Sequence, residues 1–429
     1  MSLLLALPFS VRMLLLFVVG ACLGSLINLG IYRLAYQRRR ISPWSFTRGK
    51  IPRRSWVDCV PVFGWWRLRR EEKLQGRGFW VRPMLIELCF ALGVAALYVL
   101  EVNQYALNMT EVWPGRRPTE AQFVGLLHVQ FAIHVVLLAV MLVATFIDID
   151  EQTIPDVVTV PGTVVALLLA AFCTSPALPS LQVDVNFPRP ENLISPLRFD
   201  YPFSQPTGAG AFLGSGASLA IGLAIYLGWC FALLPRQWRR GIRIGKAWRM
   251  MWWRIAARAE WVWVLPLAVA GVLLIVSAWV KGGQPWHGLM TALVGMAAGG
   301  GMIWLIRVIG SAMLQQEAMG FGDVTLLAMI GAFLGWQAII IVFFIAPFVG
   351  VVFGGIQWLL FRQNVLPYGP FLCLAALVTL LFWVPLWDYA ARIFEIPWLV
   401  PSAIVVCLPL LAGMLYGWML LKRRIMNDE

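Results

Sequence analysis

Charged side chains are scarce in this sequence: Asp, Glu, Lys and Arg make up 13% of its 429 residues, whereas 60% of the residues are hydrophobic. The mean hydropathy is +0.77. An average soluble domain has about 25% charged residues, so this composition excludes an ordinary soluble globular protein. Apolar runs of about 18 residues or more recur along the chain, and this is the length that crosses a bilayer. We therefore predict an all-α polytopic membrane protein.

The sequence also lacks paired cysteines and clustered histidines. None of its seven cysteines forms a Cys-x-x-Cys pair, and His128, His134 and His287 show no metal-ligand spacing with acidic partners. Neither a disulfide framework nor a zinc site is therefore supported, and we predict no metal site. The chain shows no nucleophilic Ser or Cys with a neighbouring His, and no glycine loop of the phosphate-binding kind.

Eleven apolar segments are candidate spans, so we predict a bundle of roughly ten or eleven transmembrane helices. The segments are 13–34, 83–100, 124–147, 157–173, 209–234, 261–280, 289–309, 324–335, 338–360, 370–387 and 398–420. The eighth is short for a complete crossing. The first is not preceded by a basic region, so we interpret it as a retained span rather than a cleaved signal peptide.

Lysine and arginine are unevenly divided between the two sides of these spans. One side holds 27 of the 34, in 33–82, 235–259, Arg307, Arg362 and 422–424. The positive-inside rule makes that side cytoplasmic, with the N-terminus outside and the C-terminus in the cytoplasm. The net charge of +13 then indicates contact with anionic membrane lipid, and we predict no nucleic-acid partner.

Two acidic sites stand at the ends of apolar runs on the predicted cytoplasmic side. Asp148 ends a span that goes inward, and Asp323 begins a span that goes outward. Gly320 and Gly322 precede Asp323 and carry no side chain, so another backbone can approach this carboxylate closely. A carboxylate at the mouth of a membrane span is costly unless it is paired, hydrated or protonated, which makes both aspartates candidates for function.

The two aspartates have two interpretations at this point. If their carboxylates meet, mutual repulsion forces one of them to hold a proton. The ionised carboxylate can then take a proton from water while the protonated one polarises a carbonyl, which is peptide hydrolysis by general acid–base catalysis. In the alternative, each aspartate is a solvated span end or a helix cap.

The motifs around both aspartates resemble those of the type IV prepilin peptidases, which are leader peptidases and N-methyltransferases. The run from Glu317 to Gly335 looks like their GxGD segment, and the run from Phe146 to Asp156 looks like their first aspartate motif. Weaker matches follow the expected order at 24–33, 82–88 and 367–371. The resemblance covers 11–165 and 289–385.

This resemblance implies roles for seven residues. Asp148 and Asp323 would be the catalytic pair, and Gly320 and Gly322 would shape the approach to Asp323. The resemblance further implies that the remaining three line the site or engage a basic leader peptide; these are Asp150, Asp156 and Glu317. The implied substrate is a prepilin or pseudopilin, cut beside its apolar helix at the cytoplasmic face of the bacterial inner membrane.

The sequence departs from the family pattern in three respects, of which the first, in the loop 33–82, bears on both zinc and methylation. Members commonly have two Cys-x-x-Cys pairs in the loop 33–82, which are thought to bind zinc. This chain has only one cysteine there, Cys59, and its lack of the pairs argues against zinc. Members also methylate the new N-terminus with S-adenosylmethionine, for which no motif is readable here; proteolysis itself needs no cofactor. Thr325 stands where lysine is usual. Residues 174–285 look like an insertion that adds two spans, an even number that keeps Asp323 on the side of Asp148.

We accordingly divide the chain into four regions. Residues 1–105 hold the first two spans and the loop 33–82, and 106–173 hold the first aspartate motif. The insertion 174–285 has an external loop and a basic cytoplasmic loop, and 286–429 hold the GxGD region and the C-terminal spans. The alternative function is a multi-pass transporter or an assembly scaffold for pili or secretion, without peptidase activity. A degenerate, inactive peptidase is a third hypothesis, which the retention of both aspartates disfavours.

Overall fold

The fold is that of a computed structural model, which describes residues 7–38, 43, 54–103, 120–173, 215–234, 245, 249, 261–314, 319–361, 367–394 and 399–427. Every regular element in these ranges is a helix, as the composition predicts. The longer helices are α2 (Phe9–Leu34), α5 (Val81–Tyr98), α6 (Glu120–Glu151), α7 (Asp156–Phe172), α9 (Gly216–Ala232), α11 (Trp261–Lys281), α12 (Gly283–Leu314), α13 (Phe321–Leu334), α14 (Trp336–Phe361), α15 (Gly369–Leu381), α16 (Trp383–Phe394) and α17 (Leu399–Asn427). The short helices are η1 (Trp56–Cys59), α3 (Phe63–Leu68), η2 (Arg69–Glu71), α4 (Glu72–Gln75) and the π-helical turn η3 (Val99–Asn103).

Within these ranges, six helical segments are long and apolar enough to cross a membrane by themselves. They are Phe9–Leu34, Val81–Asn103, Leu127–Glu151, Val262–Lys281, Pro285–Leu314 and Trp336–Gly355. Five further apolar segments are shorter: Asp156–Phe172, Gly216–Ala232, Phe321–Leu334, Gly369–Leu381 and Ser402–Met414. The helices therefore fit a multi-pass membrane protein. The total number of crossings and the direction of the termini stay predictions.

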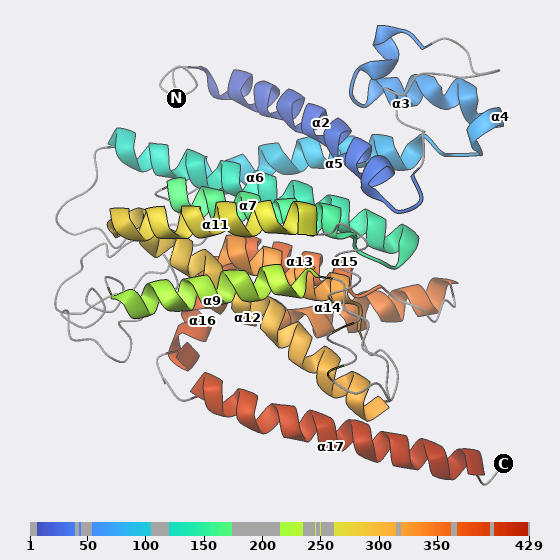
Figure 1. Cartoon of the computed structure of the whole chain (residues 1–429). Coiled ribbons are helices and arrows are strands. Elements are labelled where there is room, and N and C mark those ends of the chain that lie inside the picture. The colour runs from blue at the N-terminus through green and yellow to red at the C-terminus, as the bar shows by residue number, and fades with distance from the viewer. Residues whose placement is uncertain are drawn as a thin grey trace.

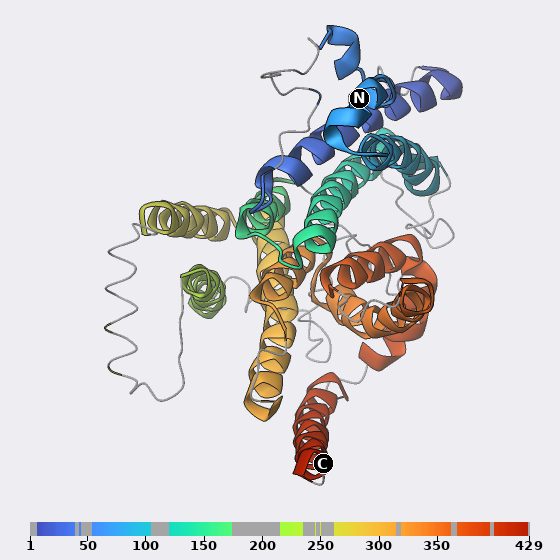
Figure 2. The same ribbon diagram turned by 90° about the vertical axis from the view of Figure 1, so that its right-hand side faces the viewer.

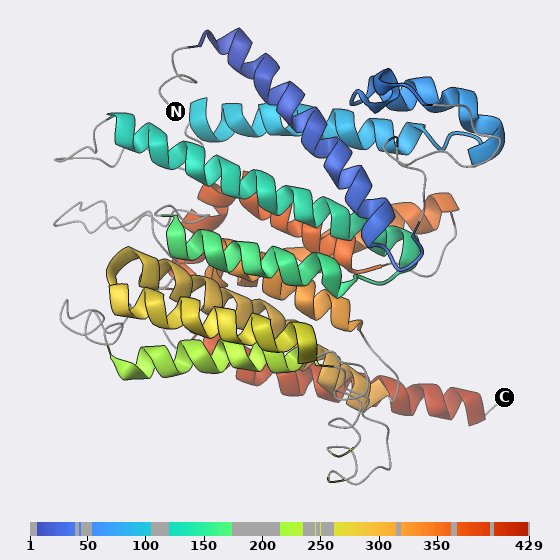
Figure 3. The same ribbon diagram turned by 45° about the horizontal axis from the view of Figure 1, so that its top comes forward.

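The long helices lie side by side in one bundle (Figure 1). α2 packs along α5, and α6 packs against both α2 and α15. Seen along the bundle, α14 and α15 lie on one side of α12, whereas α9 and α11 lie on the other (Figure 2). Helices α9 and α11 come from the predicted insertion, and they contact each other and α12. The small helices α3 and α4 lie beside the end of α5 (Figure 3).

Helix α13 is enclosed by other helices, because every residue from Asp323 to Leu334 is buried. Its sequence is apolar on all sides, which is typical of a helix surrounded by protein. α12 crosses it at glycines: a Cβ on Gly295 would overlap the carbonyl oxygen of Gly331, and one on Gly299 would overlap that of Leu327. Small residues at four-residue spacing let two helices approach to backbone contact. This explains how a segment too short for a full crossing is accommodated.

Some helix ends differ from those that the sequence predicts. The segment 370–387 is not one helix: α15 ends at Leu381, and α16 begins at Trp383. Between them Phe382 has φ −111° and ψ 29°, a bridge-region conformation that interrupts the α-helix. Asp148 and Asp323, predicted to end one span and to begin another, lie in the last turn of α6 and the first turn of α13.

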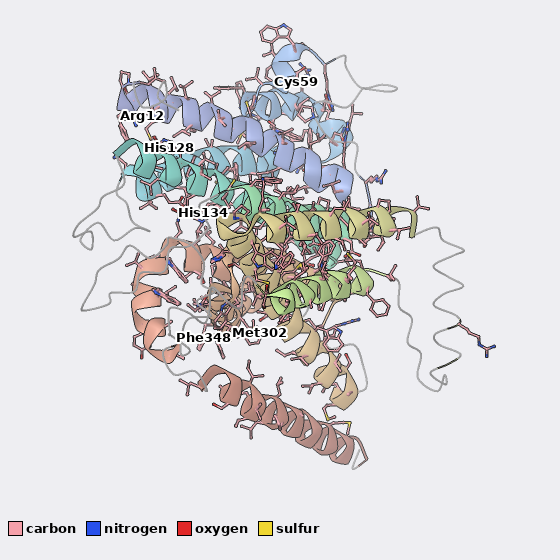
Figure 4. The ribbon with its side chains drawn as sticks, turned by 60° about the vertical axis from the view of Figure 1, so that its left-hand side comes forward. Arg12, Cys59, His128, His134, Met302 and Phe348 are labelled. Carbon is pink, nitrogen blue, oxygen red and sulfur yellow. The ribbon has the colours of Figure 1, made fainter. Side chains whose placement is uncertain are left out.

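A cluster of polar side chains joins α2, α5 and α6 near the end of the bundle that lies away from Asp148. The Tyr98 hydroxyl hydrogen-bonds Nε2 of His128 at 3.1 Å and accepts from Arg12 at 3.4 Å. His134, fully buried, contacts Glu101 through Nδ1 at 2.7 Å. Figure 4 shows Arg12 close to His128, with His134 further along α6. Both histidines thus link helices.

Candidate active site

Asp148 is buried near the C-terminal end of α6, where the start of α15 holds its carboxylate. The N–H of Gly369 donates a hydrogen bond of 3.1 Å to Oδ2 of Asp148. Gly369 is the first residue of α15, so this N–H has no partner within the helix, and the partial positive charge of a helix N-terminus favours a carboxylate there. Any Cβ at Gly369 would meet Oδ2 of Asp148 and the side chain of Ile154. A residue larger than glycine would therefore require both of these side chains to shift.

Asp323 lies in the first turn of α13 and is 9% exposed, against 4% for Asp148. Ile154 lies against both Gly322, the residue before Asp323, and Gly369, whose N–H binds Asp148. Helices α6, α13 and α15 pack on one another. The structure therefore brings the two predicted aspartates together at one end of the bundle, around the start of α15.

Tyr368 borders the same cluster from the residue before α15. Burial and then the charge of Asp323 raise the pKa of Tyr368 to about 12. A tyrosine hydroxyl is protonated at neutral pH in any case, so that of Tyr368 is a hydrogen-bond donor near Asp323. Sequence reasoning did not assign a role to Tyr368 or Gly369. The signal was the weak motif match at 367–371, which carries both.

The two glycines before Asp323 differ in their surroundings. A Cβ on Gly322 would lie 2.9 Å from both the Cβ and the carbonyl oxygen of Ile154, in the connection between α6 and α7. A Cβ on Gly320 would meet Oδ2 of Asp323 at 3.5 Å, an ordinary contact. Close packing against the first aspartate segment therefore requires glycine at Gly322 but not at Gly320.

The structure places two of the other three predicted site residues. Asp150 forms an ion pair of 2.6 Å with Arg82, which also donates to the carbonyl oxygen of Phe146 at 3.3 Å. Asp156 is half-buried at the first position of α7. Glu317 lies outside the described residues. Glu151, to which the sequence assigned no role, accepts hydrogen bonds from two backbone N–H groups just after α2.

The weak motifs at 24–33 and 82–88 meet at one buried carboxylate, that of Glu87. It accepts hydrogen bonds from four donors on α2 and the loop before α5. They are Ser25 Oγ at 2.7 Å, Asn28 Nδ2 at 3.1 Å, Trp65 Nε1 at 2.8 Å and the Val62 N–H. Glu87 therefore fixes the loop to the first two spans rather than facing the aspartates.

Buried ion pairs hold the described part of the loop before α5. Asp58, with no exposed surface, contacts Arg70 at 2.6 Å and Arg67 at 3.3 Å, and Glu71 contacts Arg54 at 2.7 Å. Burial alone would raise the pKa of Asp58, but the Ser55 N–H and the two guanidinium groups outweigh it and hold the pKa below its usual range. Among the residues that the structure describes, no three His, Cys, Asp or Glu side chains are grouped to hold a metal.

Thr325, at the position where lysine is usual in the resembling family, is buried between α7 and α13. Its hydroxyl accepts a hydrogen bond of 3.0 Å from Thr159 and donates one of 3.0 Å to the carbonyl oxygen of Gly322. The hydroxyl thus ties α13 to α7 two residues after Asp323. A lysine there would remove this hydroxyl and its two hydrogen bonds.

Comparisons with known proteins support the resemblance for part of the chain. Residues 260–355 match the model of the type IV leader peptidase family. A prepilin leader peptidase/N-methyltransferase of Aeromonas salmonicida is 35% identical over 123 residues, 28% of this chain and 40% of the relative. Its counterpart in Burkholderia pseudomallei is 36% identical over 124 residues, covering 28% and 38%. The Escherichia coli protein of that name is 32% identical over 100 residues, covering 22% and 44%.

The match has clear limits along the chain. The chain spans about 40% of the length of the curated relatives that it matches. No solved structure matches it. The family-model range includes Asp323 and its two glycines, and it also takes in α11 from the predicted insertion, but it does not include Asp148. The resemblance to the prepilin peptidases is confirmed in that range, which holds Asp323 at the start of the buried helix α13.

Proposed function

We propose that this protein is a membrane aspartyl endopeptidase that removes the basic leader peptide of a type IV prepilin or pseudopilin. One observation carries the proposal: Asp148 and Asp323, which are 175 positions apart in the sequence, lie buried together at one end of the helix bundle. The family match around Asp323 supports the same activity. The excess of Lys and Arg in the loops at this end supports a cytoplasmic location of the cut.

In the proposed mechanism the two carboxylates share one proton, and this proton belongs to the pair rather than to either residue. The ionised carboxylate takes a proton from water, whose oxygen attacks the scissile carbonyl carbon. The protonated carboxylate gives its proton to the carbonyl oxygen. Return of a proton to the leaving nitrogen then breaks the C–N bond and releases the leader acid and the new N-terminal amine.

Named residues around the pair would support this chemistry. The Gly369 N–H fixes one carboxylate of the pair, so less reorganisation is needed during the reaction. Gly322 lets the segment after α6 pack directly against the start of α13. Asp156, half-buried at the start of α7, would attract the basic residues of a leader peptide, and the same role is proposed for Asp150 and Glu317.

Methylation of the new N-terminus is a second proposed activity. The relatives named above are called leader peptidase/N-methyltransferases. The buried charged side chains in the described part of the loop before α5 bind one another, so they offer no donor set for S-adenosylmethionine. No catalytic step is therefore assigned to this cofactor.

Mass spectrometry of a co-expressed prepilin tests both activities. Wild-type protein should yield a prepilin that lacks its leader, and an added methyl group on the new N-terminus would report methylation. Asp148→Asn and Asp323→Asn should each leave the leader attached. Normal processing by either variant would exclude the aspartyl mechanism. Absence of processing by the wild-type protein would favour the alternative of a transporter or assembly scaffold.

A further inference from the structure

An apolar groove of about 950 Å³ runs along the bundle between α5, α6 and α15. Cys89 and Gly93 of α5, Met141 and Ile149 of α6, and Leu377 of α15 are among the residues that line it. On each helix the lining residues recur at three- or four-residue spacing, so each helix presents one continuous face. No residue that lines the groove carries a charge.

The groove is about as long as three turns of an α-helix. On α6 its lining runs from Leu138 to Ile149, and on α15 from Pro370 to Leu381. Each stretch has eleven helical rises of about 1.5 Å, which give a length of about 16 Å. This is about half of the 30 Å hydrocarbon core of a bilayer and corresponds to three turns of an apolar helix.

One end of the groove reaches the candidate active site. Ile149 directly follows Asp148, and Pro370 directly follows Gly369, whose N–H binds that aspartate. Asp150 and Asp156 lie at this same end, near the last turn of α6 and the start of α7. The groove is thus apolar along its length, and three carboxylates lie beyond its end, those of Asp148, Asp156 and Asp150, the last in its ion pair with Arg82. Such a surface complements a helix that is apolar along its length and preceded by basic residues.

Gly93 of α5 is a small residue in the groove, and no neighbouring atom requires it to be small. A Cβ on Gly93 would meet nothing within 4 Å. The opposite face of α5 is closely packed, because a Cβ on Gly20 or Gly24 of α2 would press on its backbone. Small residues on an open helix face let an incoming helix approach closely. The open position at Gly93 is therefore room for a partner.

We propose that this groove seats the apolar helix of the substrate, so that the bond before that helix reaches Asp148 and Asp323. The occupant follows from the proposed function, in which the peptide is cut beside an apolar helix. Lipid chains and a second copy of this protein are the other occupants that the test must separate.

A bulky residue at Gly93 should block the seat without disturbing the fold. Gly93→Phe is expected to lower kcat/KM for a full-length prepilin at least tenfold, mainly through KM. The matched control is Gly413→Phe on α17, another exposed helical glycine with nothing within 4 Å of a built Cβ. This control should process prepilin like the wild type. Processing by Gly93→Phe at the wild-type rate would overturn the proposal, and would be the result if only lipid occupies the groove.

Oxidative cross-linking tests the seat independently of cleavage. Cys89 is exposed in the groove, and Cys22 is exposed on α2 outside it. A prepilin with one cysteine in its apolar helix, mixed with the Asp323→Asn protein in nanodiscs, should form a disulfide that Cys89→Ala removes and Cys22→Ala leaves intact. A cross-link that is absent, or that survives Cys89→Ala, would overturn the proposal.

The two experiments distinguish failure of the groove from failure of the proposed function. Loss of cleavage in the wild-type protein together with a Cys89 cross-link would reject the peptidase and retain the helix seat. Normal cleavage by the wild-type protein together with normal cleavage by Gly93→Phe would retain the peptidase and reject the helix seat. A disulfide between the Cys89 residues of two copies of this chain would assign the groove to self-association and overturn the substrate proposal.

Discussion

The N–H of Gly369 binds the carboxylate of Asp148 across 221 positions of sequence, at 3.1 Å. This hydrogen bond joins the first aspartate motif to the start of α15, a helix that lies beyond the matched family range. The aspartate pair therefore depends on three separate parts of the chain, namely the ends of α6, α13 and α15.

Gly369→Ala should impair processing without unfolding the protein. The added methyl would meet Oδ2 of Asp148 and Ile154, and a displaced catalytic group can cost about tenfold or more in rate. The rate of prepilin cleavage and the melting temperature in detergent should be measured together. Gly355→Ala, at an exposed position of α14 with nothing nearby, is the control. Unchanged cleavage by Gly369→Ala would show that the contact is not needed.

The two glycines before Asp323 should respond differently to alanine. Gly322→Ala would press on the backbone of Ile154 and should lower both cleavage and stability, whereas Gly320→Ala meets only an ordinary contact and should retain most of its cleavage activity. Cleavage assays on the two variants side by side make the comparison. Equal losses in both would contradict the steric difference.

The two aspartates should behave as one unit. Asp148→Asn or Asp323→Asn alone should remove nearly all cleavage. The double variant should be no worse than either, because one substitution already destroys the pair that shares the proton. Single-turnover assays with long incubation would measure the residual rates. A double variant far below both single variants would indicate independent roles.

Glu87→Ala should destabilise the fold through its four donors. Removal of the acceptor leaves buried N–H and O–H groups unpaired, at a cost of about 3 kcal/mol in unfolding free energy. Glu87→Gln keeps one acceptor oxygen and should lose less. Thermal unfolding in detergent checks both. Wild-type stability in Glu87→Ala would remove the assigned role.

Acid should loosen the loop before α5 through Asp58. Because the folded-state pKa of Asp58 lies below its ordinary value near 3.8, its contribution to stability is complete above that pH and declines as the pH falls through the folded pKa. Hydrogen exchange of 54–80, measured by mass spectrometry, should rise as the pH is lowered across that range, after correction for the intrinsic pH dependence of exchange. Arg70→Met should weaken this dependence. A loop that exchanges equally in both proteins at every pH would contradict the prediction.

The sequence sufficed to predict those features that depend on local pattern. Composition predicted helices and spans, and the parity of the spans placed Asp148 and Asp323 at the same end, where the structure finds them together. The role of Gly369 was not predictable, because it depends on where α15 begins in space. The difference between Gly320 and Gly322 likewise depends on the position of Ile154. The break at Phe382 was missed because the apolar run continues through it, so hydropathy alone carries no signal.

The enclosure of α13 has a consequence for how the protein is made. This helix has 14 residues, which span about 21 Å, less than the hydrocarbon thickness of a bilayer. It carries a carboxylate in its first turn, and its close partner α12 is synthesised just before it. During biosynthesis, therefore, α13 becomes stable in the membrane only when it packs against α12 and α7. Its entry into the membrane is a step of folding rather than an independent insertion.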